Sequence, residues 1–549
     1  MVVRFVREET SEVAEASSED RSTLNELPSP PRQLLDRHGA RVLDPATAVV
    51  APGQPVPRTT VYRPGVFLMP QRYLRDQEAL AAVNGVLARI GLYCEPADRG
   101  GDSAAVKELA RARQFEDLPV RALLRVREDS GPVVVDCWKA LQELRSAAAG
   151  ERPELDPDMV ARTSPEHLLF TTPVFGGVPW ETSGLGGTPW ETSGFGAGSS
   201  YGRTRGANRI PVTLAAAPPY RSEKSGHRRP VIAVLDTGIG PHPWFGLADR
   251  SGPPAAGTGL AVAPDIQAAI LQAELATGTT LHTQLLTDYW DAPTTGRPLI
   301  GDIDTDTGHG LFIAGIVRQA CPEADTLAIR VVHSDGVAYE ADVLLALHLL
   351  ADRVRDAQAN NRPEHMVDIV SLSLGYYEEN PADIAYTGQF GAAIAELLGL
   401  GVLVVAAAGN DATTRRFYPA AFADQPLGGG CGPQVISVGA LNPDVTTSKA
   451  LFSNEGPWVR CWATGAGVVS TYPTDVRGTA AADHEVPDHG RNSFDPDDYS
   501  AGFAVWDGTS FAAPLAAAEL GKALLQSGDL ATVDRDTVVK RAWTALGSL

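Results

Sequence analysis

The stretch that decides the fold of this chain reads Gly508-Thr509-Ser510-Phe511-Ala512-Ala513-Pro514-Leu515. It places a serine between small residues at the start of an apolar, alanine-rich run that predicts a helix. The first turn of a helix has backbone N–H groups without intrahelical partners and carries the positive end of the helix dipole. A hydroxyl there can act as a nucleophile beside a developing oxyanion. On its own the stretch is weak evidence, because Gly-Thr-Ser also forms ordinary helix caps.

Three other segments supply the partners that such a nucleophile needs. Residues 231–238 and 402–410 contain apolar runs that predict buried strands, and these runs end at Asp236 and Asn410. A third segment begins a helix with His309 between two glycines. A carboxylate, an imidazole, an amide and finally the hydroxyl therefore follow one another along the chain.

These segments, in this order, resemble those of the subtilisin-like serine peptidases, the subtilases. The resemblance extends over residues 228–547. Within it, residues 371–375 are similar to the family's substrate-binding strand, and residues 452–456 and 468–471 are similar to the stretch before the nucleophile. The resemblance implies a doubly wound α/β fold with a mostly parallel sheet, and an enzyme that hydrolyses peptide bonds.

The resemblance gives each polar residue a role that its chemistry supports. A serine hydroxyl is a poor nucleophile at neutral pH and needs an adjacent base, so His309 would accept the proton of Ser510. Asp236 would hold the imidazole in one tautomer and stabilise its protonated form. Asn410 would donate its side-chain N–H to the oxyanion, beside the backbone N–H of Ser510. His242 is a rival base, but the family has a structural His-Pro at that place.

The same resemblance places the walls of the substrate cleft at Ser373, Leu374, Gly375, Ala408 and Gly409. Asp411 follows at the family position on the rim of the primary specificity pocket, and acidic residues crowd the insertion 474–505. We therefore expect basic or polar residues just before the cleaved bond, with a solvated acidic loop as the alternative explanation.

Two residues depart from the family pattern next to the histidine. Leu311 and Phe312 replace the threonine and the second histidine that usually follow the catalytic histidine. Those positions pack behind the site in the family, so we expect repacking there without loss of activity.

Beyond the motifs, apolar runs alternate with helical stretches from residue 231 onward. This alternation is typical of a mostly parallel sheet covered on both faces by helices, with catalytic residues at strand ends and helix starts. The expected strands are 231–235, 327–332, 367–373, 402–407, 434–439 and 467–470. The expected helices are 264–275, 309–319, 340–357, 386–399, 510–525 and 535–545.

Three regions are expected before a catalytic domain at residues 228–549. Residues 1–58 are polar, acidic and proline-containing, and they predict a mostly disordered tail. Residues 59–173 predict a β-α-β-β-α-β order, a small ferredoxin-like α+β module that is either propeptide-like or an interaction domain. Residues 174–227 predict a Gly/Pro-rich linker that contains a ten-residue, tryptophan-bearing repeat.

Composition narrows the classes of function. The formal net charge of −21 at pH 7 argues against nucleic acid and anionic membranes as partners. No apolar run is long enough for a membrane span, and the first residues lack the apolar core of a signal peptide. The five cysteines are widely spaced without a C-x-x-C pair, which favours a reducing cytoplasm. Arg, Ala and Pro are abundant and Lys is scarce, which suggests a bacterial source.

No metal and no other cofactor is expected. Asp302, Asp304 and Asp306 alternate just before His309 and offer oxygen ligands for calcium. The run lacks the glycine and the distal glutamate of a calcium loop, so the carboxylates alone do not predict a bound ion.

The sequence therefore predicts a cytoplasmic serine endopeptidase that acts on protein or peptide substrates. We expect either a zymogen or an enzyme regulated by a partner protein that engages the N-terminal region. The alternative is a catalytically silent subtilase scaffold that only binds peptides or partner proteins. The presence of Asp236, His309, Asn410 and Ser510 together argues against that alternative.

Overall fold

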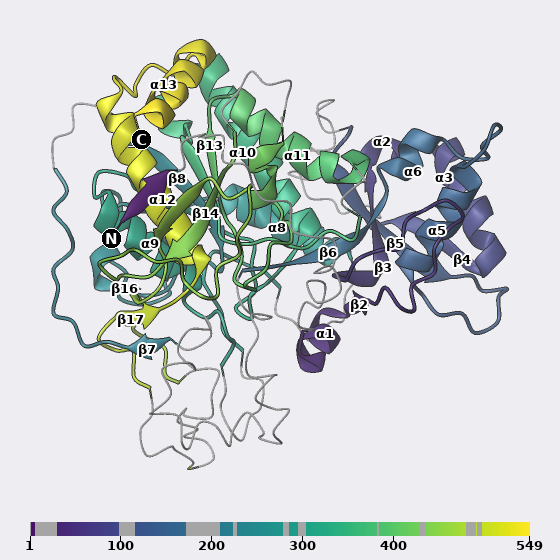
Figure 1. The fold of residues 1–549 in the computed structure, drawn as a ribbon, viewed down its shortest axis with the longest axis horizontal. Coiled ribbons are helices and arrows are strands. Elements are labelled where there is room, and N and C mark those ends of the chain that lie inside the picture. The colour runs from purple at the N-terminus through teal and green to yellow at the C-terminus, as the bar shows by residue number, and fades with distance from the viewer. Residues whose placement is uncertain are drawn as a thin grey trace.

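The computed structural model describes residues 2–5, 30–97, 116–171, 209–222, 228–277, 285–294, 303–380, 384–425, 427, 434–478, 490 and 497–548. Figure 1 shows a larger part on the left, built around one twisted sheet, and a smaller part on the right. We call them the catalytic unit (228–548) and the N-terminal unit (60–171). None of the described helices combines the length and the apolar character that a membrane span requires.

The catalytic unit is built on an eight-stranded sheet with the order β1-β15-β14-β13-β12-β8-β10-β9. Seven of its strands run parallel; they are β8 (Val231–Asp236), β9 (Leu260–Val262), β10 (Asp325–Arg330), β12 (Ile369–Leu372), β13 (Leu403–Ala407), β14 (Ile436–Leu441) and β15 (Cys461–Thr464). The short strand β1 (Val3–Phe5) adds to the free edge of β15 in the antiparallel sense. Because both faces are covered, residues 232–236 of β8 are all buried, with Ala233 and Leu235 in one core cluster and Ile232 and Val234 in the other.

Helices lie on both faces of this sheet, which confirms the predicted mostly parallel α/β class. One core cluster takes residues from α8 (Pro264–Ala276), α10 (Glu340–Ala359) and α11 (Ile384–Gly399). The other takes residues from α9 (His309–Ala320), α12 (Thr509–Gln526) and α13 (Arg535–Gly547). The catalytic unit also has short 3-10 helices at Pro243–Phe245, Pro363–His365 and Ala420–Asp424.

The N-terminal unit is an antiparallel sheet with helices packed on it. Its elements are β3 (Thr60–Pro70), α2 (Gln71–Arg75), α3 (Gln77–Leu87), a 3-10 helix (Ala88–Ile90), β4 (Leu92–Pro96), β5 (Pro119–Val126), α5 (Cys137–Ala148), α6 (Pro157–Ala161) and β6 (Ser164–Phe170). The strands are ordered β6-β3-β5-β4. A separate apolar core cluster, which includes Phe67, Leu87, Leu124 and Leu141, lies between this sheet and its helices.

Strand β6 joins the two units. It pairs with β3 on one side and with β11 (Val337–Tyr339) of the catalytic unit on the other, both antiparallel. All of its residues are buried. Figure 1 shows β6 reaching from the N-terminal unit into the catalytic unit. The last strand of the N-terminal unit is therefore also paired with a strand of the catalytic unit.

Part of the tail that we expected to be mostly disordered is folded. Besides β1, residues 30–58 contain α1 (Arg32–His38) and β2 (Arg41–Leu43), which pairs with β3. Arg37 Nη1 of α1 contacts Asp304 Oδ1 at 2.6 Å and Asp335 Oδ2 at 2.8 Å. These partners lie far away in sequence, so the composition of the tail alone gave no sign of them.

The expected linker 174–227 is only partly covered by the structure. Residues 209–222 are described, and β7 (Ile210–Pro211) pairs with β17 (Phe503–Trp506), which in turn pairs with β16 (Val468–Thr471). The tryptophan-bearing repeat lies outside the described residues.

Candidate active site

Asp236 and His309 meet at the carboxyl edge of the parallel sheet. Strand β8 ends at Asp236, and α9 begins at His309, directly after Gly308 with its left-handed φ of 83°. The His309 Nδ1–H donates to Asp236 Oδ1 over 2.7 Å, and both side chains are buried. Burial lowers the pKa of His309, but the carboxylates of Asp236, Asp306 and Asp291 together outweigh burial, so the pKa of His309 is raised.

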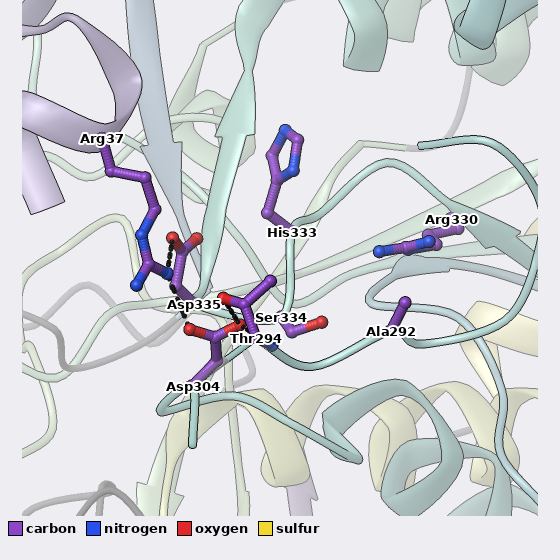
Figure 2. A pocket seen from close by; sticks show the side chains of 8 residues that line it. All are labelled: Arg37, Ala292, Thr294, Asp304, Arg330, His333, Ser334 and Asp335. Atoms are coloured by element: carbon purple, nitrogen blue, oxygen red, sulfur yellow. Dashed lines mark hydrogen bonds and ion pairs between the residues drawn. The ribbon is translucent and has the colours of Figure 1, made fainter. Parts of the chain in front are cut away.

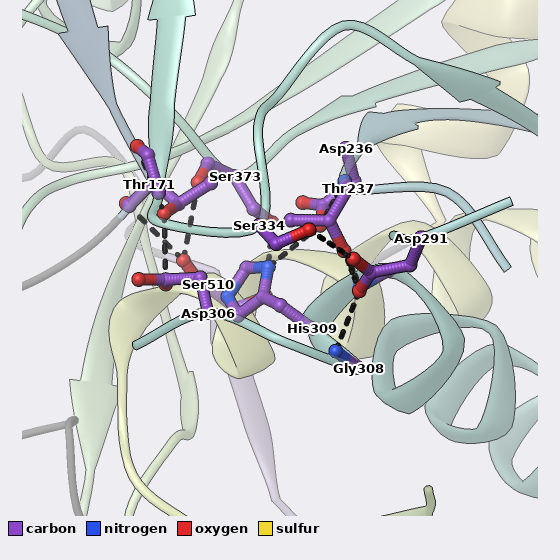
Figure 3. Close-up of polar contacts among 12 residues, drawn as sticks. Thr171, Asp236, Thr237, Asp291, Asp306, Gly308, His309, Ser334, Ser373 and Ser510 are labelled. Carbon is purple, nitrogen blue, oxygen red and sulfur yellow. Dashed lines mark hydrogen bonds and ion pairs between the residues drawn. The ribbon is translucent and has the colours of Figure 1, made fainter. Parts of the chain in front are cut away.

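Ser510 lies in the first turn of α12, as the sequence predicted. Its Oγ is 3.2 Å from the Ser373 carbonyl oxygen and 3.4 Å from the Thr171 carbonyl oxygen. Figure 3 shows the His309 imidazole between Asp236 and Ser510. Among the described residues the Nε2 atom of His309 has no hydrogen-bond partner. One ring nitrogen is thus fixed by a carboxylate, and the other remains available on the side of the hydroxyl.

Asn410 lies three residues after the end of β13 and is tied to the start of α12. Its Oδ1 accepts from the Thr509 backbone N–H at 2.9 Å, while the Gly409 N–H donates to Thr509 Oγ1 at 3.1 Å. This reciprocal pair fixes the orientation of the amide. The Nδ2 group of Asn410 is buried and donates to no described residue, which leaves it free to bind a developing negative charge.

Asp291 is a buried carboxylate that the sequence analysis missed. It accepts hydrogen bonds from the Thr237 hydroxyl at 3.0 Å, the Ser334 hydroxyl at 2.6 Å and the Gly308 N–H at 2.6 Å. The Thr237 hydroxyl also accepts from the Gly310 N–H at 3.0 Å. These bonds connect the end of β8 to the start of α9, so they set the position of His309 relative to Asp236 (Figure 3). No local pattern around Asp291 identifies it in the sequence.

The end of β6 and the following residue, residues 168–171 of the N-terminal unit, lie extended in the predicted substrate cleft. The Phe170 N–H donates to the Gly375 carbonyl at 2.8 Å, and the Gly375 N–H donates back to Phe170 at 2.9 Å. On the other side, the Thr171 N–H donates to the Gly336 carbonyl at 2.9 Å. This is how an extended peptide adds a strand to exposed strand edges. The chain therefore presents its own peptide backbone to Ser510.

The other predicted cleft residues differ in what they touch. Ser373 donates from its Oγ to the Ser510 carbonyl at 2.9 Å. Leu374 belongs to an apolar core cluster of the catalytic unit, because strand alternation turns its side chain away from the neighbouring edge. The Ala408 carbonyl accepts from Asn454 Nδ2 at 2.9 Å, and Gly409, with φ of 97°, lies so close that a Cβ would be 2.3 Å from the same nitrogen.

Asp411 is bonded through one of its two carboxylate oxygens, while its Oδ1 is buried and has no hydrogen-bond partner among the described residues. Its Oδ2 accepts from the Tyr377 hydroxyl at 2.6 Å, and burial raises the pKa of Asp411 to about 6. In the acidic insertion, Asp475 is paired with Arg250 and Asp498 with Arg477. The other acidic residues of this insertion, apart from Asp497, lie outside the described residues; they are Asp483, Glu485, Asp488 and Asp495.

His242 is held by its surroundings, away from Asp236. Its Nε2–H donates to the Gly502 carbonyl at 2.8 Å, and its Nδ1 accepts from the Trp244 N–H at 3.1 Å. Burial lowers the pKa of His242 to about 4. Both ring nitrogens of His242 are therefore used in hydrogen bonds to the backbone.

The residues that depart from the family pattern pack behind the histidine. Leu311 belongs to an apolar cluster with Ile239 and Trp290. The Phe312 ring lies 4.5 Å, between centroids, from the ring of Phe511, the residue after Ser510. Apolar side chains thus occupy the two positions where the family pattern has a threonine and a second histidine.

The acidic run before His309 is occupied by protein side chains. Asp304 contacts Arg37 and accepts from the Thr294 N–H and hydroxyl, both at 2.7 Å, beside a cavity of about 10 Å³ (Figure 2). Asp306 accepts from two threonine hydroxyls. Asp302 lies outside the described residues, and in the part of the chain that the structure describes no three carboxylate, histidine or cysteine groups come together as a metal site.

Comparison with known proteins points to one family. A family model described as "Subtilase family" matches residues 227–542. A "Subtilisin-like protease 3" from Pseudogymnoascus destructans is 32% identical over 178 residues, 31% of this chain and 38% of that protein. An "Intracellular serine protease" from Paenibacillus polymyxa is 30% identical over 180 residues, 30% of this chain and 46% of that protein. "Subtilisin BL" from Lederbergia lenta is 28% identical over 253 residues, 44% of this chain and 79% of that protein.

The matched part is a fraction of each leading relative. The chain spans less than half the length of the first relatives, 38% of the Pseudogymnoascus protein and 46% of the Paenibacillus protein. The family match, by contrast, covers all four of the polar residues that meet at the carboxyl edge of the sheet, from Asp236 to Ser510.

Proposed function

Because the chain belongs to the subtilase family, we propose that it is a serine endopeptidase with Ser510 as nucleophile. One observation carries the proposal. An extended backbone lies in the cleft with a carbonyl oxygen 3.4 Å from Ser510 Oγ, beside a histidine whose other nitrogen is fixed by Asp236. Nucleophile, oriented base and a bound peptide are the parts that acyl transfer requires.

The proposed reaction proceeds in two steps. His309 Nε2 takes the Ser510 proton as Oγ attacks the substrate carbonyl carbon, and Asp236 stabilises the imidazolium that forms. Asn410 Nδ2 and the Ser510 backbone N–H donate to the oxyanion of the tetrahedral intermediate. His309 then protonates the leaving amine, which departs and leaves an acyl-enzyme. A water molecule, deprotonated by His309, hydrolyses the ester and restores the Ser510 hydroxyl.

We further propose that the N-terminal unit is propeptide-like and inhibits the enzyme that carries it. Three observations support this proposal: its antiparallel strand order β6-β3-β5-β4, the complete burial of β6, and the pairing of Phe170 with Gly375 in the cleft. While Thr171 covers Ser510, a substrate cannot reach the same strand edges. Activation then requires that residues 168–171 leave the cleft, either after a cut or when a partner protein engages the N-terminal unit.

We propose an intracellular setting for the enzyme. Cys94, Cys137, Cys321 and Cys461 are buried free thiols. Burial raises the pKa of Cys94 to about 12 and that of Cys321 to about 11, so both stay protonated and inert. Free buried thiols are compatible with a reducing compartment.

A serine-directed fluorophosphonate probe tests both proposals on the full chain. We expect slow labelling of the wild type, no labelling of Ser510→Ala, and faster labelling of Phe170→Pro, which removes the N–H that bonds to Gly375. Phe170→Ala, which keeps that N–H, is the matched control. Absence of labelling in every variant would favour the silent scaffold, while equal rates in wild type and Phe170→Pro would remove the inhibitory role and leave the peptidase intact.

A further inference from the structure

The side chain of Thr171 makes a specific contact inside the cleft. Its hydroxyl donates to Asp306 Oδ1 at 2.9 Å, and both side chains are buried (Figure 3). Thr171 lies in the strand that occupies the substrate position, and its carbonyl faces Ser510. The contact therefore shows what the cleft offers to a substrate side chain at this position.

Asp306 is oriented by the catalytic unit itself. Its Oδ2 accepts from the Thr305 hydroxyl at 2.7 Å, and its backbone N–H donates to the Ser334 carbonyl at 2.8 Å. The Asp306 carbonyl also accepts from the His309 N–H at 3.0 Å. The carboxylate is thus held one turn before the catalytic helix whether or not Thr171 is present, and only Oδ1 depends on the occupant of the cleft.

The space around this carboxylate is small. A Cβ on Gly336 would lie 2.5 Å from Asp306 Oδ2 and 2.8 Å from the Thr171 hydroxyl, so the glycine backbone closes directly over the pair. The same glycine accepts the Thr171 N–H. A short side chain with a hydroxyl fits between these groups, whereas a long side chain has no room beside the Gly336 backbone.

We propose that Asp306 is a specificity-determining residue that selects threonine or serine at the substrate position occupied here by Thr171. The inference rests on the proposed peptidase function. An apolar side chain of the same shape would leave Asp306 Oδ1 buried without a donor, and sites built to bond a hydroxyl reject analogues that lack it. Valine, which has the shape of threonine, should therefore be a substrate at least about 10-fold poorer in kcat/KM.

The test uses the full-length chain and internally quenched peptides. Each peptide carries Glu-His-Leu-Leu-Phe, the sequence of residues 166–170, then one varied residue, then Ala-Ala-Ala. The varied residue is Thr, Ser, Val, Ala or Lys, and mass spectrometry locates the cleaved bond. The readout is the ratio of kcat/KM for the Thr and Val peptides on one enzyme, so a general loss of activity cancels.

The wild type should prefer the Thr and Ser peptides over the Val and Lys peptides by about 10-fold or more. Asp306→Ala should bring the Thr/Val ratio to within about 2-fold of unity, and Asp306→Asn, which retains an acceptor, should be intermediate. Asp498→Asn, at an exposed carboxylate paired with Arg477, is the charge control and should keep the wild-type ratio. A wild-type ratio near unity, or one that survives in Asp306→Ala, overturns the inference. Failure to cleave any peptide, both in the wild-type chain and in the chain with Phe170→Pro that frees the cleft, overturns the proposed function instead.

Discussion

The catalytic unit and the contact that joins it to the N-terminal unit are held together by opposite means. The central sheet is apolar on both faces, as the buried residues of β8 show. The contact between the units combines an apolar cluster, which includes Leu168 and Val337, with buried charges. His167 of β6 lies between Glu340 and Glu379, at 2.9 Å from each, and Arg121 of β5 contacts Asp342 at 2.9 Å. Both regions are closed to solvent, yet one excludes charge and the other depends on it.

The two regions therefore respond differently to substitution. An apolar core tolerates many compatible side chains, while a buried ion pair adds little net stability but carries a large penalty when one partner is removed. The N-terminal unit is therefore specified in one position over the cleft, and its attachment is vulnerable to the loss or titration of a single group. We expect changes in the catalytic unit to alter catalysis and changes in the charged contact to alter access.

The largest expected effect lies wholly on the catalytic side of this comparison. Ser510→Ala should reduce kcat by at least about 10⁴-fold, because the Ser510 hydroxyl is the proposed nucleophile that forms the acyl-enzyme. The loss of one small hydroxyl in a helix first turn should cost at most about 1–2 kcal/mol of stability. Turnover and thermal melting are to be measured on the same samples. Substantial turnover in a folded Ser510→Ala protein would break the assignment of the chemistry to this unit.

Asn410→Ala should come next in size. Loss of the corresponding donor of subtilisin costs about 10²–10³ in kcat, and we expect the same range here with KM little changed. Comparison of kcat with the melting temperature distinguishes two roles of Asn410. If Asn410 only caps Thr509, the substitution should lower the melting temperature with little change in kcat, whereas the loss of an oxyanion donor should lower kcat. A fall of less than about 10-fold would place the oxyanion elsewhere.

His167→Ala tests the charged contact. The change leaves Glu340 and Glu379 buried without the imidazolium between them, a loss that costs about 3–5 kcal/mol in comparable buried pairs. The N-terminal unit should loosen, and fluorophosphonate labelling of Ser510 should become at least about 10-fold faster. His365→Ala, at a half-buried histidine outside this contact, should leave the rate unchanged. Equal rates for both variants would show that the backbone pairing of β6 suffices.

The same contact should respond to pH in a defined direction. Burial alone would lower the pKa of His167, but Glu379 and Glu340 raise it from 6.5 to about 10. A raised pKa gives a stabilisation that is fully present below pH 6.5 and is lost as the pH rises through about 10. The labelling rate of the wild type should therefore increase between pH 7 and 10 relative to that of His167→Gln. Parallel pH profiles for the two proteins would contradict the assignment to His167.

Strand β1 should give the smallest effect. Only Val3 and Phe5 pack against the core, both are partly exposed, and no ion pair holds the strand among the described residues. Removal of residues 1–5 should lower the melting temperature slightly, by the equivalent of about 1–2 kcal/mol, without a change in kcat. A larger loss than that of His167→Ala would reverse the order of importance of the two regions.

The sequence predicted the elements whose cause is local. The apolar run before Asp236 became β8, and the expected helix at 340–357 is observed at Glu340–Ala359. Sequence pattern suffices for such elements, because a strand buried on both faces is a continuous apolar run and the helix at 340–359 repeats its apolar residues with the helical period. The motifs likewise predicted that Asp236 and His309 interact, and the two side chains lie within hydrogen-bonding distance.

What the sequence could not provide depends on contacts between distant residues. Asp291 has three donors from separate loops, and no pattern near it in the chain announces them. Helix α1 forms where composition suggested disorder. Its Arg37 binds the carboxylates of Asp304 and Asp335, which lie 267 and 298 residues away in the chain. The contact of Thr171 with Asp306 belongs to the same class. Such contacts exist only after the two units have met.

The N-terminal stretch of the chain touches the catalytic unit through two separate strand additions, β1 on β15 and β6 on β11. In Figure 1 they lie on different sides of that unit. A cut anywhere in residues 172–208 would leave both additions on one fragment, so the nicked protein would behave as a bivalent complex. When one strand detached, the other would keep it at high effective concentration, and rebinding would outpace escape. A nicked molecule would thus migrate as two polypeptides under denaturing conditions and as one particle in gel filtration, and avidity would set the time for which it stays silent.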